Sequence, residues 1–281
     1  MRKHPLPFAY CLLLIVYCLA PSTLSAQQLL SSRGEPILPQ KGNWGVMVDA
    51  MPFLQLSGNL SNNTSANNAP AFNFPGGYAH TLVLKKYKSE KKALRIKFTK
   101  GSNETKDSLF VVDLGGTNPD PSIWDYKKIT KKNFAVGIGF QKARGIGRLQ
   151  GYSGMEALLG FPSTTVDYSY GGGPLTQFNW IHTNSFSQGR GVIKIEDGKT
   201  VSINVHFLLG AEYFFAPRLS LSAEYSWGLK FLSEADGTKT SEEWNFSSNK
   251  IKTTSAVVPG NSSFSIDNDN NGGFINLAFY F

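Results

Sequence analysis

The chain has 281 residues and a formal net charge of +8. Beyond residue 26 no apolar run approaches about 18 residues, which excludes membrane-spanning helices from that part of the chain. Excess basic charge often indicates a nucleic-acid partner. The export signal described next makes an anionic membrane surface the better match for this charge, and no nucleic-acid partner is expected.

The first 26 residues have the pattern of a secretory signal peptide. Two basic residues near the start precede an apolar stretch over 8–20, and small residues precede a cleavage point after Ala26. Cys11 and Cys18 both lie in this segment, and each follows a tyrosine rather than the small residue that precedes a lipid-modified cysteine. We therefore expect cleavage without lipid attachment and a mature chain that begins at Gln27 and contains no cysteine.

Residues 41–281 are predicted to form one domain, preceded by a short segment over 27–40 that would lie in the periplasm. Within the domain, apolar and polar residues alternate with the period of two that is typical of β-strands. In 200–215, for example, every odd position is apolar, whereas most even positions are polar or small. The predicted strands, in chain order, are 44–50, 81–85, 94–99, 134–141, 148–161, 200–215, 219–231 and 274–281.

The length of the alternating segments favours a membrane β-barrel over a soluble β-sandwich. Soluble strands average about five or six residues, whereas a tilted strand needs about 9–11 residues to cross a bilayer. The longest segment here, 200–215, exceeds that length. We therefore expect an all-β fold, an antiparallel up-and-down transmembrane β-barrel with eight strands, or ten as the alternative count.

The predicted connections alternate between short and long. Short turns are expected at 88–92, 144–147 and 216–218, and long loops at 57–77, 101–132, 162–199 and 233–271. Membrane barrels have short turns on the periplasmic side and long loops outside. The long loops are therefore expected to be extracellular.

In these features the chain resembles the small outer-membrane β-barrel superfamily that includes OmpX-, OmpW- and opacity-type proteins. The resemblance is carried by the alternating hairpin over 201–231, the glycine-rich hairpin over 134–159, and the aromatic end at Phe279, Tyr280 and Phe281. It covers residues 41–281 and is specific for fold and location. It implies a place in the bacterial outer membrane, with Phe279 and Phe281 as the signal read by the barrel-assembly machinery.

If the apolar faces point to lipid, a set of polar side chains points into the lumen and forms an interior polar network. An eight-stranded barrel is just wide enough to be filled by its own side chains. We expect these charges to pair and close the lumen, and the alternative is a narrow, porin-like conduit. The inward set is Asp49, Lys85, Arg95, Lys97, Arg148, Glu156, His206, Glu212, Glu224 and Lys230.

An aromatic girdle is expected on the outward face near the short turns, as membrane barrels carry aromatic rings at both interfaces. Two lysine-rich clusters lie where anionic lipid head groups would lie, one around 85–97 and one over 127–132. A solvated charge run is an equally good interpretation of both clusters. The predicted girdle comprises Phe140, Tyr213, Phe215, Phe279 and Phe281.

No catalytic residue, metal ligand or cofactor site is assigned. His182 and Ser185 match the histidine–serine signature of outer-membrane lipid A deacylases in neither order nor spacing, and His80 has no carboxylate nearby in the sequence. Residues 267–272 resemble half of a calcium loop but lack the glutamate at its twelfth position. Ser108, between Asp107 and Leu109, is a possible O-glycosylation site.

We therefore expect a monomeric, non-enzymatic outer-membrane protein that acts in envelope structure or in surface interaction through its outer loops. The alternative is a narrow conduit for small or apolar solutes, and a lipid-modifying enzyme comes third. The expected partners are outer-membrane lipids, including lipopolysaccharide, and the barrel-assembly machinery during insertion. The sequence names no ligand.

Overall fold

The protein is all-β in the part of the chain that the structure describes. The computed structural model describes residues 29–50, 79–111, 123–182, 184–266 and 273–281, and no helix that could cross a membrane is found there. Twelve antiparallel strands make one sheet. They are β1 (Trp44–Asp49), β2 (Ala79–Ser89), β3 (Lys92–Val111), β4 (Ile123–Ile146), β5 (Leu149–Ser169), β6 (Val192–Glu196), β7 (Thr200–Ala216), β8 (Leu219–Glu234), β9 (Gly237–Asn245), β10 (Lys250–Val258), β11 (Ser262–Ile266) and β12 (Gly273–Tyr280).

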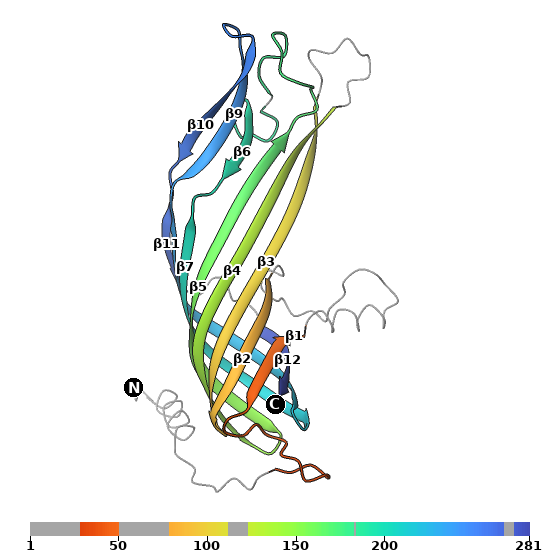
Figure 1. Ribbon diagram of the computed structural model, residues 1–281, viewed down its shortest axis with the longest axis vertical. Coiled ribbons are helices and arrows are strands. Elements are labelled where there is room, and N and C mark those ends of the chain that lie inside the picture. Colours follow the sequence, from red (N-terminus) through yellow and green to blue (C-terminus); the bar gives the residue numbers. More distant parts are fainter. Residues whose placement is uncertain (1–28, 51–78, 112–122, 183, 267–272) are drawn as a thin grey trace, which may run out of the picture.

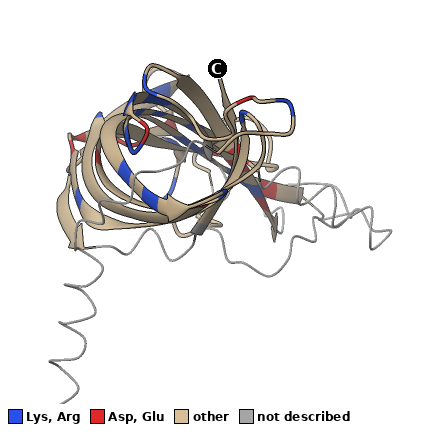
Figure 2. Ribbon diagram, turned by 90° about the horizontal axis from the view of Figure 1, so that it is seen from below, with Lys and Arg blue, Asp and Glu red and all other residues tan. Residues whose placement is uncertain are grey.

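Eight of these strands form a closed ring. Each of β1, β2, β3, β4, β5, β7, β8 and β12 pairs with its neighbour in that order, and β12 returns to β1. Val46 lies opposite Phe279 at the closure, and the backbone N–H of Trp44 donates to the carbonyl of Phe281. The predicted pairing of the last segment with the first is therefore confirmed. Figure 2 shows the ring end-on.

The short turns lie where they were predicted, but three of the four predicted long loops contain strands. Tight turns join β4 to β5 and β7 to β8. Most of 101–132 is strand, since β3 and β4 continue upward past the short strands β1 and β2 (Figure 1). The predicted loop 162–199 contains the end of β5 and all of β6, and 233–271 contains β9, β10 and β11.

The strands within the predicted loops were not predicted for a common physical reason. Alternation reports a strand with one apolar and one polar face. β10 lacks such faces, since all of its residues but the last are exposed. β6 and β9 are mostly half-buried along their whole length, so burial does not alternate there either. The predicted loop 57–77, the predicted signal peptide and the calcium-like segment 267–272 lie outside the described residues.

The faces of the ring are inverted relative to a soluble protein. Along β8, buried Ser220, Ser222 and Glu224 alternate with Leu221 and Tyr225, which are 43% and 48% exposed. Polar side chains therefore fill the inside, and apolar side chains cover the outside.

An apolar cluster closes the lower end of the ring. It comprises Ile37, Met47, Val83, Tyr87, Ala93, Phe214, Ala278 and Tyr280. Ile37 belongs to residues 29–40, which we call the strap, and it is only 2% exposed although it lies outside every strand. Leu29 and Leu38 of the strap pack against the same cluster. The strap therefore covers the end of the ring where the short turns lie.

A buried charge network as the candidate functional site

Six charged side chains meet inside the ring, and we call them the charge network. They stand on inward positions of β2, β3, β5, β7 and β8, so the same alternation that exposes the apolar residues buries these charges. Three are basic and three are acidic, so the set is neutral. Its members are Lys85, Arg95, Lys97, Glu156, Glu212 and Glu224.

The level nearest the short turns is built on Glu212. Lys85 Nζ lies 3.1 Å from one carboxylate oxygen of Glu212, and the other oxygen accepts hydrogen bonds from the hydroxyls of Tyr280 and Ser220. The ammonium of Lys85 also lies 3.3 Å from the Tyr280 hydroxyl and 5.3 Å from the centre of the Tyr152 ring. Both charges are thus satisfied by several partners, which offsets the cost of removing them from water.

The middle level is a bidentate pair between Arg95 and Glu224. The two guanidinium nitrogens donate to the two carboxylate oxygens at 2.7 and 3.0 Å. Arg95 donates also to Gln141 Oε1 at 3.0 Å, and the Tyr152 hydroxyl donates to Glu224 at 2.8 Å. This fork geometry is the strongest form of ion pair that side chains make.

The upper level centres on Glu156. Lys97 Nζ donates to one of its oxygens at 2.7 Å, and Arg95 lies 3.6 Å from the other, which links this level to the one below. His206 Nδ1 is 3.7 Å from Glu156, too far for a hydrogen bond. A base and its orienting acid need hydrogen-bond contact. Because Lys97 already engages the carboxylate of Glu156, His206 and Glu156 do not form the pair of a base and its orienting acid that catalysis would need.

The network can fill the lumen and fix the register of the strands around it. The charge network reaches across the ring. Lys85 stands on β2 and Glu212 on β7, and β1, β12 and β8 lie between these two strands, yet the charged groups of the two side chains are 3.1 Å apart. Each of the six charges has an opposite charge within 3.1 Å, so the charges are paired with one another inside the ring.

The other predicted inward residues lie in different places. Arg148 is a correction: it belongs to the turn between β4 and β5, is exposed, and donates to the backbone carbonyl of Phe215. The alternation predicted that Arg148 points inward because it does not mark where a strand begins, and Arg148 lies one residue before β5. Asp49 and Lys230 stand half-buried on the inward face, and each has an interaction partner.

The outward and loop candidates are exposed. The five girdle aromatics, Phe140, Tyr213, Phe215, Phe279 and Phe281, all point away from the lumen with exposures between 44% and 59%. Ser108 is exposed but lies on β3 opposite Tyr126, not in a loop as predicted. The side chain of His80 lies outside the described residues.

Residues 170–191 fold between the ends of β5 and β6. The His182 ring stacks on Tyr170 at 4.4 Å, and burial lowers the pKa of His182 against the opposing fields of Glu242 and Asp125. Burial raises the pKa of Tyr170 to about 12. Ser185 donates its hydroxyl to the carboxylate of Asp125.

Sequence reasoning missed the neutral partners of the network, although their signal was present. Tyr152, Tyr280, Gln141 and Ser220 occupy inward positions in the same alternation that identified the charges. An inward tyrosine or glutamine beside a buried carboxylate must hydrogen-bond to it or remain unsatisfied. The alternation alone could therefore have added them to the network.

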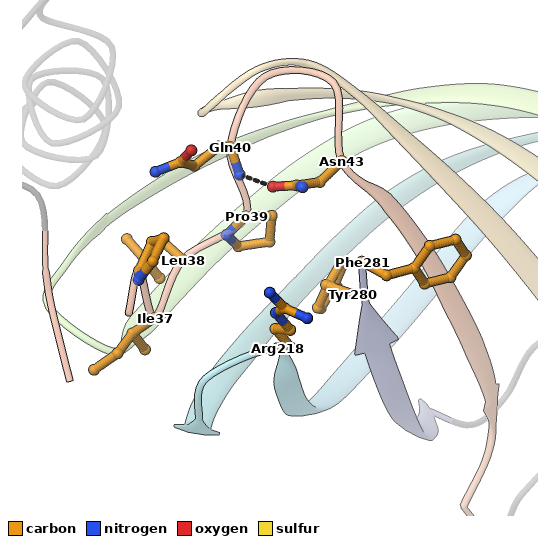
Figure 3. Close-up of a pocket in the computed structure, with 9 residues that line it drawn as sticks. Ile37, Leu38, Pro39, Gln40, Asn43, Arg218, Tyr280 and Phe281 are labelled. Atoms are coloured by element: carbon orange, nitrogen blue, oxygen red, sulfur yellow. Dashed lines mark hydrogen bonds between the residues drawn. The ribbon is translucent and has the colours of Figure 1, made fainter. Parts of the chain in front are cut away.

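A cavity of about 230 Å³ lies between the strap and the lower rim of the ring (Figure 3). The strap contributes residues 36–40, and the ring contributes Arg218, Tyr280 and Phe281. Gln40 N–H donates to the side chain of Asn43, which shapes the upper wall. Arg218 is the single charged side chain among the lining residues, so the cavity offers no pair of groups for acid–base chemistry.

Comparison with known proteins yields little. No family model matches the sequence, and no curated protein matches it. Among solved structures, the chain is similar to a major outer membrane protein from Thermus thermophilus, with 11% identity and a TM-score of 0.39 over 85% of this chain and 99% of that one. A likeness at this level assigns neither a fold nor a role to this chain.

Proposed function

We propose that the chain is an integral β-barrel of the bacterial outer membrane, closed to solutes, that acts in envelope structure or surface interaction rather than in catalysis or conduction. One observation carries the proposal. The outer surface of the ring is apolar on every strand, whereas the inside holds a neutral set of ion pairs. In water this arrangement exposes the residues that should be buried, and in a bilayer both faces are satisfied.

The height of the apolar surface fits a bilayer. On β4 the outward residues from Phe134 to Phe140 are apolar, and Lys132 and Lys142 bound them on either side. These lysines are ten residues apart, roughly 33 Å along the strand and roughly 25 Å along the ring axis for a tilt of about 40°. Outer-membrane barrels have an apolar band of about 25 Å.

The closure of the ring supports a spanning role. In hydrocarbon every backbone N–H and C=O must find a partner within the protein, and only helices and closed barrels achieve this. The β12–β1 pairing removes the open edge that an unclosed sheet would leave. The strap would then lie in the periplasm and the tall hairpin of β3 and β4 outside the cell.

A fractionation experiment tests the proposal. The tagged full chain, expressed in a bacterium with an outer membrane, should sediment with the outer membrane and resist carbonate extraction. It should also migrate faster on a gel before boiling than after it, because a folded barrel resists detergent. Recovery as a soluble, carbonate-extractable protein would refute the proposal.

The closed interior has its own test. Purified protein in a planar bilayer should give no steady ion conductance, because the charge network occupies the ring. Stable open channels would favour the conduit that the sequence left as an alternative.

A further inference from the structure

Two outward lysines lie beside Phe98, Phe134 and Phe161, three outward phenylalanines on β3, β4 and β5 that we call the aromatic rim. Lys100 on β3 faces Phe134 on β4, and Lys132, two residues farther up β4, faces Ser102. Lys132 also faces Ser163 on β5. All of these side chains are exposed and share the outer face of the sheet. We call Lys100, Ser102, Lys132 and Ser163 the lysine site.

Register separates these lysines from the rest of the 127–132 cluster. Outward positions on β4 are even-numbered, so Lys132 and Lys128 face outward, whereas Lys127 and Lys131 face the lumen side. The sequence alone treated these four lysines as one cluster. The structure divides them into two surfaces that meet different surroundings.

The lysine site carries positive charge without a counterion in the described part of the chain. Lys100 and Lys132 are diagonal neighbours across the ladder, with side chains roughly 7 Å apart at their bases. Neither makes an ion pair with any residue that the structure describes. The outward acid nearest along β3, Glu104, pairs with Lys128 at 3.0 Å. Two like charges at this spacing repel each other unless an anion lies between them.

The surface below the lysine site is apolar. Phe134 on β4 pairs with Phe161 on β5, and Phe98 on β3 lies diagonally from Phe134; the three are 46%, 45% and 36% exposed. A ligand that fits both surfaces has an anionic head with oxygens for the ammonium and hydroxyl groups, and acyl chains for the aromatic rings. Free phosphate satisfies only the upper half of this surface.

We propose that the lysine site binds the phosphate of an acylated, phosphate-bearing lipid of the outer leaflet, whose chains pack on the three phenylalanines. The inference rests on the proposed function, because the aromatic rim must lie at the bilayer surface. Lys stems can follow the apolar surface while their ammonium groups reach the phosphate plane. The hydroxyls of Ser102 and Ser163 supply further hydrogen bonds to its oxygens.

The test compares two double variants of equal charge change. Lys100→Gln with Lys132→Gln removes the site, whereas Lys106→Gln with Lys127→Gln removes two lysines higher on the same strands and leaves the Glu104–Lys128 pair intact. Native mass spectrometry of the folded full chain in detergent, titrated with diphosphorylated lipid A, measures binding. Lipid A from which the phosphates have been removed serves as the second probe, and inorganic phosphate as the competitor.

The expected results are specific. Wild type should prefer the phosphorylated lipid, and the site variant should bind it about thirtyfold more weakly, since each lysine at an anionic surface contributes about fivefold. The control variant should change binding by less than about twofold, because Lys106 lies four residues beyond Ser102, roughly 13 Å farther along the strand, and Lys127 lies five residues beyond Lys132, both beyond a Debye length of about 8 Å. Inorganic phosphate should not displace the lipid.

Three results would overturn the inference: equal weakening in both variants, equal affinity for the two lipids, or displacement by inorganic phosphate. Outer-membrane fractionation of the same proteins separates the two proposals. Wild type that is found in the outer membrane but binds both lipids alike refutes the lysine site alone. Wild type that is absent from the outer membrane refutes the barrel and the lysine site together.

Discussion

Replacing Glu224 with glutamine removes one negative charge from the network and leaves the size of the side chain unchanged. The amide oxygen of the new side chain can still accept one hydrogen bond from Arg95, but the other guanidinium nitrogen loses its acceptor, and the nearest remaining acid is Glu156 at 3.6 Å, which Lys97 already engages. One charge-assisted hydrogen bond contributes roughly 1.5–3 kcal/mol, and a buried charge deprived of its partner costs about 3–5 kcal/mol. We therefore expect Glu224→Gln to lower the free energy of unfolding by about 4 kcal/mol.

The assay is reversible urea unfolding of the folded protein in lipid vesicles, followed by tryptophan fluorescence. Glu243→Gln is the matched control, because Glu243 pairs with Lys252 at 3.4 Å with both side chains about half exposed, and such a pair contributes less than about 1 kcal/mol. The double variant Arg95→Met with Glu224→Met removes both charges and should recover most of the loss. A cost below about 1 kcal/mol for Glu224→Gln, or an equal cost for the double variant, would refute the reasoning.

Three further predictions concern assembly, closure and pH. Deleting Phe281, or replacing the outward Ile275 with lysine, should abolish the folded, heat-modifiable form in outer membranes, because β12 must close the ring; wild-type recovery of both variants would show that closure does not depend on this strand. Replacing both Lys85 and Glu212 with methionine should keep the ring closed to ions, since apolar side chains fill the same space, and a conductance in planar bilayers would contradict this. Burial lowers the pKa of His182, so the unfolded segment binds the proton more tightly than the folded one, and the loop over 170–191 should be destabilised as pH falls below about 6.5. The protection factors of amides in that loop, corrected for the pH dependence of intrinsic exchange, should therefore be lower at pH 5 than at pH 7, and His182→Phe should abolish the difference; a difference in protection that persists in the variant would assign it to another group.

The sequence predicted the ring well, because each strand of the ring alternates between an apolar outside and a polar inside. Glu156, Glu212 and Glu224 could therefore be placed inside by counting residues along the strands. Arg148 shows the limit, since alternation does not mark the residue at which a strand begins.

The upper strands could not be predicted in this way. On the extension of β3 and β4, lysine, threonine and asparagine stand on both faces, and no solvent boundary distinguishes one face from the other. Nor does counting reveal which inward acid meets which base. The Arg95–Glu224 pair joins β3 to β8 across the lumen, and that contact depends on the diameter of the ring and the stagger of its strands.

The strap has a consequence for how the protein assembles. Ile37 belongs to one apolar cluster with Met47 from β1, Phe214 from β7 and Tyr280 from β12, and β1 joins the other two strands only when it pairs with β12. A sheet whose first and last strands have not yet paired lacks this apolar surface. The strap can therefore dock only after the ring has closed, and it then stabilises the closed ring. A protease supplied on the strap side should therefore cut within 29–40 in unclosed molecules and spare it in closed ones, which makes this segment a reporter of the final step of insertion.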